Sequence, residues 1–219
     1  MTATGIKPVP SPPADARNSP DRRRRPSRER ADATRNREQL LRTIRSMIEH
    51  DGAEKVTMET LAEQAGVGKG TVFRRFGTRA GIFQALLTEE ESRFEKEVES
   101  GPPPLGPGAD PVQRLVAYGR ARIEFLLAHK AIVRESIEHC RPTPQGGLTM
   151  TLPHIRALLG QTGTPWSVTD LDCLAMQLTA ALEGPLLLHL EAESVPAPGS
   201  NSHALAASWQ WLIERLLRD

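Results

Sequence analysis

Residues 57–83 read TMETLAEQAGVGKGTVFRRFGTRAGIF, and this stretch predicts two short helices joined by a glycine turn. Thr57 is placed to cap the first helix, because a threonine side chain can accept a hydrogen bond from an amide of the first turn. Gly66 ends that helix, since glycine adopts the left-handed conformation of a tight helix exit without steric cost. A second helix then starts near Lys69. The pair is typical of a helix-turn-helix.

The second helix of this pair has an inward and an outward face. Val72 and Phe76 are four residues apart and face inward. The outward face would meet a major groove of DNA and carries Lys69, Gly70, Thr71, Phe73 and Arg74. Arg75 and Arg79 flank this surface. The stretch therefore predicts a cationic DNA-reading helix.

The stretch resembles the DNA-binding domain of the tetracycline-repressor (TetR) family of bacterial transcriptional regulators. The pattern usual in that family is a threonine, then I-A-x-x-A-G-V-S-x-x-T-L-Y-x-H-F, and then a lysine a few residues on. This sequence matches the pattern along nearly its whole length, and the resemblance is strong over residues 36–95 and continues only in outline beyond them. It implies a helical regulator that binds operator DNA.

Some positions depart from the family pattern. Phe73 replaces a tyrosine and lacks the hydroxyl that family members aim at a phosphate, so this contact does not carry over. Gly68 stands where serine is common and weakens the cap of the reading helix. Arg79 replaces the lysine that begins the next helix and keeps a cation where the family grips the DNA backbone. Other exchanges are Leu61 for isoleucine, Val72 for leucine and Arg75 for histidine. The predicted DNA-binding residues are Thr57, Lys69, Gly70, Thr71, Phe73, Arg74, Arg75 and Arg79.

The net charge of +1 conceals a strong division along the 219 residues. Met1 to Ile82 contain 17 Lys and Arg against 10 Asp and Glu, which gives +7. The remainder contains 11 against 17, which gives −6. The basic part is the one expected to meet a polyanion.

Residues 1–33 form a Pro/Arg-rich arm. It contains six prolines, and six arginines lie between positions 22 and 30. Such a segment buries too little apolar surface to order itself, so we expect it to be disordered. Two interpretations stay open for the arm. It is either a solubilising tail or an extension that contacts the backbone or minor groove of DNA.

The rest of the chain predicts an all-α fold, because no strand-like alternation appears. A helix at about 34–50 with Leu40, Ile44 and Met47 on one face completes a DNA-binding domain at 34–83. Residues 84–219 are assigned to a helical regulatory and dimerisation domain. Thr78 caps a helix at 79–99, and Asp110, followed by Pro111 and Gln113, caps a helix that extends to about His129. Further helices are expected at about 130–140, 147–160, 168–192 and 203–218.

The last two predicted helices are unusually apolar, which favours a subunit interface and a homodimer. Their apolar rows extend beyond what one small bundle covers. The predicted interface residues are Leu178, Leu182, Leu205, Trp209, Leu212 and Leu216.

Three polar residues interrupt the apolar helix at 168–192, namely Gln177, Thr179 and Glu183. Burying them without partners is costly, so they either pair across the dimer or line a cavity for a small-molecule effector. Tyr118 and Trp166 are further candidates for pocket walls, with plain core packing as the alternative.

Several function classes are not expected. No catalytic constellation or metal-ligand spacing is recognisable, so we expect no enzyme, no metal and no cofactor. Cys140 and Cys173 lie 33 residues apart and are interpreted as reduced core residues of a cytoplasmic protein. The apolar stretch at 171–190 is interrupted by polar residues and proline, which argues against a membrane span. The N-terminus lacks the apolar core of a signal peptide.

The sequence as a whole predicts a cytoplasmic bacterial homodimer that pairs a helix-turn-helix domain with a helical ligand-binding domain. The resemblance makes repression the default, with a small molecule releasing the protein from a palindromic operator. The alternative is a ligand-free architectural DNA-binding dimer whose C-terminal domain only holds the subunits together. A closed apolar cavity with several polar groups would favour the sensor, and a filled core the alternative.

Overall fold

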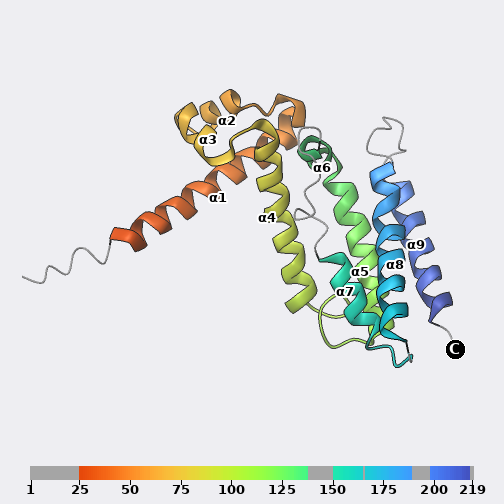
Figure 1. The fold of residues 1–219 in the computed structure, drawn as a ribbon. Helices are drawn as coiled ribbons and strands as arrows, with labels where there is room; N and C mark the ends of the chain where they lie inside the picture. Colours follow the sequence, from red (N-terminus) through yellow and green to blue (C-terminus); the bar gives the residue numbers. More distant parts are fainter. Residues whose placement is uncertain (1–24, 138–149, 165, 189–197, 218–219) are drawn as a thin grey trace, which may run out of the picture. The chain divides into compact units, whose positions relative to one another are not determined.

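A computed structural model describes residues 25–137, 150–164, 166–188 and 198–217 (Figure 1). Within these ranges every regular element is a helix and none is a strand, which confirms the predicted all-α class. The elements are α1 (Arg25–Asp51), the short 3-10 helix η2 (Ala53–Lys55), α2 (Met58–Gln64), α3 (Lys69–Phe76), α4 (Arg79–Ser100), α5 (Pro111–Ala128), α6 (Lys130–Ile137), α7 (Thr151–Leu159), α8 (Val168–Leu188) and α9 (Pro198–Leu216).

The chain divides into two compact units, Met1–Gln39 and Leu40–Asp219. The described part of the first unit is the beginning of α1, which starts at Arg25. α1 thus begins within the segment 1–33 that the sequence assigned to the arm. Pro26 is tolerated in a first helical turn, and the Arg, Glu and Ala residues that follow it favour the helix. The arm up to residue 24 lies outside the described residues.

The second unit has one continuous apolar core that begins under the helix-turn-helix. Leu40, Ile44 and Met47 of α1 are buried there, as the 3.6-residue period predicted. Val72 of α3 and Phe83 of α4 are buried in the same core. The reading helix is thus held by packing on its inward side.

The C-terminal helices of this unit are arranged around α5. This helix packs against α6, α7, α8 and α9, while α4 packs against α6 and α7 against α8 (Figure 1). Asp110 caps α5 as predicted, since its side chain accepts hydrogen bonds from the amides of Val112 at 2.9 Å and Gln113 at 3.3 Å.

Three of the predicted interface residues lie inside the protomer. Leu178, Leu182 and Trp209 are each at most 4% exposed, so the protomer's own core covers them. The apolar rows of α8 and α9 serve first to pack these helices against the rest of the protomer. Leu205 and Leu212 are half-buried, and Leu216 is exposed.

One of the two cysteines, Cys173, lies within the described residues. Cys173 is exposed on α8, which corrects its predicted place in the core, and Cys140 lies outside the described residues. Cys173 lies on the polar side of α8, whereas the leucine row of that helix lies on another side.

No helix in the described ranges has the length and apolar character that a bilayer span requires.

The closest approach of α5 and α9 depends on a glycine. Trp209 lies over Gly119, and its indole Nε1 donates a hydrogen bond of 2.9 Å to the carbonyl oxygen of Leu115. A Cβ at Gly119 would overlap the indole ring. Here glycine is required for space, since any side chain would separate the two helices.

We expect Gly119→Ala to lower the free energy of unfolding by about 1–3 kcal/mol, because the added methyl group overpacks a filled contact. Thermal unfolding followed by circular dichroism measures the loss. Gly70→Ala is the matched control, since a Cβ at this exposed helix position meets open space. That control should be neutral or stabilised by about 0.5–1 kcal/mol. Equal melting temperatures for Gly119→Ala and the unaltered protein would contradict the packing argument.

Candidate DNA-binding interface

A capping box positions the first helix of the motif. The amide of Thr60 donates to Oγ1 of Thr57 at 3.1 Å, and the amide of Thr57 donates to Oγ1 of Thr60 at 2.9 Å. Thr60 thus takes the place that Glu or Gln often has in such a box. Gly66 has φ of 65° and ends α2, so the predicted cap and turn are both confirmed.

The outward face of α3 is open to solvent. Phe73 is 62% exposed, which is unusual for a phenylalanine, while Val72 and Phe76 on the opposite face are buried. The remaining members of the outward face, Lys69, Gly70, Thr71 and Arg74, are exposed or half-buried, and the flanking Arg75 is exposed. The predicted division into an inward and an outward face is therefore present.

Lys69 and Arg74 on this face make solvent-exposed contacts within the protein. Lys69 pairs with Glu59 of α2, and both side chains are more than half exposed. This hydrogen bond holds the pKa of the Glu59 carboxyl below its usual range. Nε of Arg74 donates to the carbonyl oxygen of Gly70 at 3.3 Å. Exposed pairs of this kind contribute little stability, so a DNA phosphate could replace Glu59 at low cost.

Arg79 is placed differently from the other predicted contacts. Its guanidinium donates to the carbonyl oxygens of Val56 and Ala53, both at 2.8 Å, and it forms an ion pair with Glu135 of α6. It also lies 4.9 Å from the ring centre of Phe83. Its contact with a DNA phosphate stays a prediction, and its donors already have partners within the protein.

Two of the five predicted effector residues meet in the C-terminal helices. The hydroxyl of Tyr118 on α5 donates to Oγ1 of Thr151 on α7 at 3.0 Å, and Thr151 donates to Oε1 of Glu183 on α8 at 2.6 Å. All three residues are buried. The structure thus joins Tyr118 and Glu183 through a threonine that sequence reasoning did not single out.

A buried arginine extends this chain of contacts. Arg122 of α5 lies 3.2 Å from a carboxylate oxygen of Glu183 and 3.3 Å from one of Glu91 on α4. Burial raises the pKa of both carboxyls, and the charge of Arg122 opposes that rise. Burial also raises the pKa of Tyr118 to about 12. We call these five residues, Glu91, Tyr118, Arg122, Thr151 and Glu183, the buried polar cluster.

The other predicted effector residues lie apart from this cluster. Gln177 is exposed, and Thr179 donates to the carbonyl oxygen of Ala175 at 2.8 Å within its own helix. Trp166 lies in the segment before α8, where its indole nitrogen is buried without a partner among the described residues.

The ring of His154 packs against that of Tyr118 in a tilted arrangement with ring centres 4.6 Å apart, and burial lowers the pKa of His154 to about 4.

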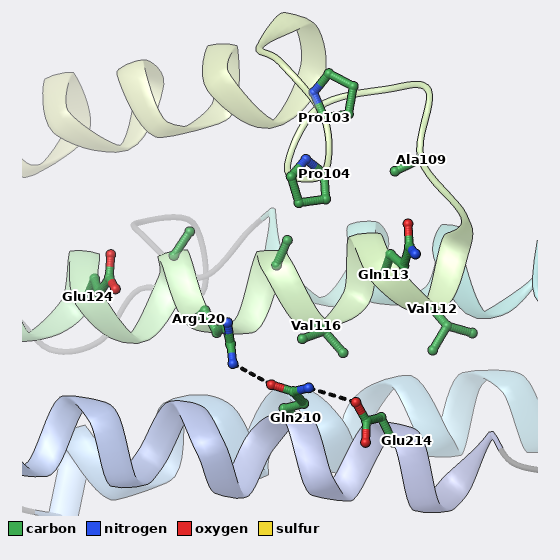
Figure 2. Close-up of a pocket in the computed structure, with 12 residues that line it drawn as sticks. Pro103, Pro104, Ala109, Val112, Gln113, Val116, Arg120, Glu124, Gln210 and Glu214 are labelled. Atoms are coloured by element: carbon green, nitrogen blue, oxygen red, sulfur yellow. Dashed lines mark hydrogen bonds between the residues drawn. The ribbon is translucent and has the colours of Figure 1, made fainter.

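A pocket lies on a different face of α5 from the buried polar cluster. It is an open groove of about 860 Å³ between the α4–α5 loop, α5 and α9 (Figure 2). Val112 and Val116 give it an apolar floor, and Arg120 donates to Gln210, which donates to Glu214 at the edge. None of the five predicted effector residues lines this groove.

The described residues hold no group of three His, Cys, Asp or Glu side chains arranged as around a metal ion. The outward face of α3 is suited to a polyanion, and the buried polar cluster is suited to organising helices.

This fold and the open cationic face of α3 define a helix-turn-helix DNA-binding protein. Residues 40–86 match the family model described as "Bacterial regulatory proteins, tetR family". The chain therefore carries the N-terminal domain of the TetR family, and the resemblance seen in the sequence is confirmed.

Solved structures share the fold over most of the chain. A TetR-family transcriptional regulator from Pectobacterium atrosepticum has a TM-score of 0.61 at 20% identity, over 86% of this chain and 95% of its own. NalD, the secondary repressor of the MexAB-OprM multidrug efflux pump in Pseudomonas aeruginosa, has a TM-score of 0.51 at 17% identity, over 82% and 95%. A transcriptional regulator from Rhodococcus sp. Rha1 has a TM-score of 0.50 at 23% identity, over 82% and 96%. A comparison with curated proteins gives no match.

Proposed function

We propose that the chain is a homodimeric transcriptional repressor. In this proposal α3 of each subunit reads one half of a palindromic operator, and a small molecule bound by the C-terminal helices releases the DNA. The observation that carries it is the solvent-open face of α3, which follows a first helix capped by Thr57, within the segment that matches the tetR family. NalD, which shares the fold, is a repressor.

The dimer follows from the size of one reading helix. α3 has eight residues and reaches only a few base pairs, so specific affinity needs a second reading about one helical turn away. Exposed apolar side chains on α8 and α9 offer a surface for it: Met176 is 63% and Trp211 65% exposed. We assign to the subunit contact the residues Met176, Leu205, Trp211, Leu212 and Leu216.

The effector is proposed to bind beside the buried polar cluster. A buried glutamate and tyrosine on facing helices provide an acceptor and a donor for one or two polar groups of an otherwise apolar molecule. The predicted wall residues Trp166, Gln177 and Thr179 remain secondary candidates for contacts with it.

The alternative is a ligand-free architectural DNA-binding dimer. One observation favours it, because the groups of the buried polar cluster satisfy one another, as in a filled core. A sensor needs these contacts to give way to a ligand. The two functions are therefore distinguished by ligand binding that responds to DNA.

The DNA-reading role is tested with an operator selected from random double-stranded DNA by the purified protein. Arg74→Ala should weaken binding by about 1–3 kcal/mol and relax the base preference at one position of each half-site, because an arginine that reads a base edge specifies as well as attracts. Arg156→Ala on α7 is the control, since it removes an exposed arginine far along the chain from α3. Unchanged affinity and preference for Arg74→Ala would place the DNA surface elsewhere.

The subunit contact is tested at its most exposed aromatic residue. Trp211→Glu should weaken the dimer by about 2 kcal/mol or more, because it removes a large apolar anchor and buries a charge in the contact. Sedimentation velocity at micromolar concentration measures the dimer fraction. Leu152→Glu on α7 also places a charge at an exposed apolar position and should leave the dimer intact. A Trp211→Glu protein that sediments as a dimer would move the interface away from α9.

The sensor role is tested by linkage between ligand and DNA. A ligand found by thermal-shift screening should bind more weakly to the protein–operator complex than to the free protein, and by the same factor that it weakens operator binding. Isothermal titration with and without operator measures both affinities. Glu183→Gln should weaken the ligand while the circular dichroism spectrum stays the same. Equal ligand affinities in the two titrations would favour the architectural dimer.

A further inference from the structure

One guanidinium joins three separate segments of the second unit. Arg79 is the first residue of α4, its acceptors Ala53 and Val56 lie at either end of η2, and its ion-pair partner Glu135 lies on α6. Glu135 is buried, with 7% of its side chain exposed, while 31% of the Arg79 side chain is exposed. The carboxylate end of the ion pair therefore lies inside the protein, and the arginine side chain is partly exposed.

The segment that Arg79 holds leads directly into the helix-turn-helix. Val56 immediately precedes Thr57, the capping residue of α2. The hydroxyl of Thr60 donates to the carbonyl oxygen of Lys55 at 2.9 Å, which ties the first turn of α2 back to η2. A displacement of η2 would therefore move the start of α2, and α3 packs on α2.

The strength of the attachment follows from its geometry. A guanidinium is planar and presents five donors in a fixed fork, so one side chain can hold two carbonyl oxygens and a carboxylate together. Loss of one member leaves a buried carboxylate or buried carbonyl groups short of a donor, which costs more than loss of an exposed pair. The contact therefore resists small displacements of α6 relative to η2.

We infer that Arg79 is a positioning residue that fixes the helix-turn-helix to α6, and that it does so in place of a contact with DNA. The path runs from Glu135 on α6 through Arg79 to η2 and the start of α2. A change in the position of α6 reaches the start of the helix-turn-helix along this path, which passes through the first residue of α4. The inference rests on the proposed function, since it assigns the route by which the C-terminal helices act on DNA binding.

The substitutions Arg79→Ala, Arg79→Lys and Glu135→Gln separate a positioning role from a phosphate contact. A phosphate contact depends on charge, so Arg79→Lys would retain most of the DNA affinity. Arg79→Ala would lower the slope of log affinity against log salt by about 0.9, and Glu135→Gln would leave both affinity and slope unchanged. A positioning role predicts a loss of about three- to thirtyfold for all three variants at an unchanged slope. It also predicts that Arg79→Ala combined with Glu135→Gln is no weaker than either alone, because both break one contact.

Hydrogen exchange measures the attachment without DNA. The amides of Lys55 and Val56 donate to the carbonyl oxygens of Gly52 and Ala53 within η2. Their exchange should be at least tenfold faster in Arg79→Ala and in Glu135→Gln, and unchanged in Arg156→Ala, whose ion pair joins α7 and α8. Circular dichroism at the same temperature confirms that the variants are folded.

The two measurements distinguish the possible failures. Unchanged exchange in Glu135→Gln, or full DNA affinity in Arg79→Lys with a lowered slope in Arg79→Ala, would overturn the positioning role. Failure of the unaltered protein to select any DNA would refute the proposed function, while the exchange rates of η2 would still decide whether Arg79 holds this segment.

Discussion

The buried guanidinium of Arg122 is the constraint around which the C-terminal helices are arranged. An arginine stays charged in a protein, so it can be buried only where carboxylates and hydrogen-bond acceptors surround it. Here Glu91 of α4 and Glu183 of α8 supply them, and the guanidinium carbon of Arg122 lies 5.1 Å from the ring centre of Phe125. These contacts fix α4, α5 and α8 in one arrangement, since sliding any of the three helices would leave a buried charge unpaired. The hydrophobic core supplies most of the stability, whereas this charge supplies the register.

α4 carries this constraint to the DNA-binding side of the molecule. Glu90, next to Glu91, accepts a hydrogen bond from Nε of Arg45 on α1 at 2.5 Å. Arg79, at the other end of the helix, holds η2 and α6. Charged side chains thus connect α4 to its neighbours along its length, while its apolar face packs in the core. From Leu40 onward, the residues assigned to the DNA-binding and the regulatory domain belong to one compact unit, Leu40–Asp219.

Sequence reasoning predicted the features whose causes are local. Thr57, Gly66 and Asp110 act on amides within a few residues, so their roles follow from the chain itself. The partners of the buried residues are remote. Arg122 and Glu183 are 61 residues apart, Trp209 and Leu115 are 94 apart, and Arg79 and Glu135 are 56 apart. No periodicity or spacing encodes such pairs. The same limit explains Trp209, which the sequence assigned to the subunit interface and which packs inside its own protomer, because apolar character does not encode which surface covers a side chain.

The placement of the cations separates two tasks that one residue type performs. Arg79 and Arg122 have buried carboxylate partners. If either arginine turned to water or to a phosphate instead, the carboxylate would stay buried without its partner, which is strongly destabilising. Lys69 has an exposed partner, and such a pair breaks at little cost. A reading surface needs cations of the second kind, because a polyanion must displace whatever they contact in the free protein. A rigid support needs cations of the first kind. The excess of positive charge before Ile82 therefore includes a cation reserved for structure, and charge alone does not identify which cations read DNA.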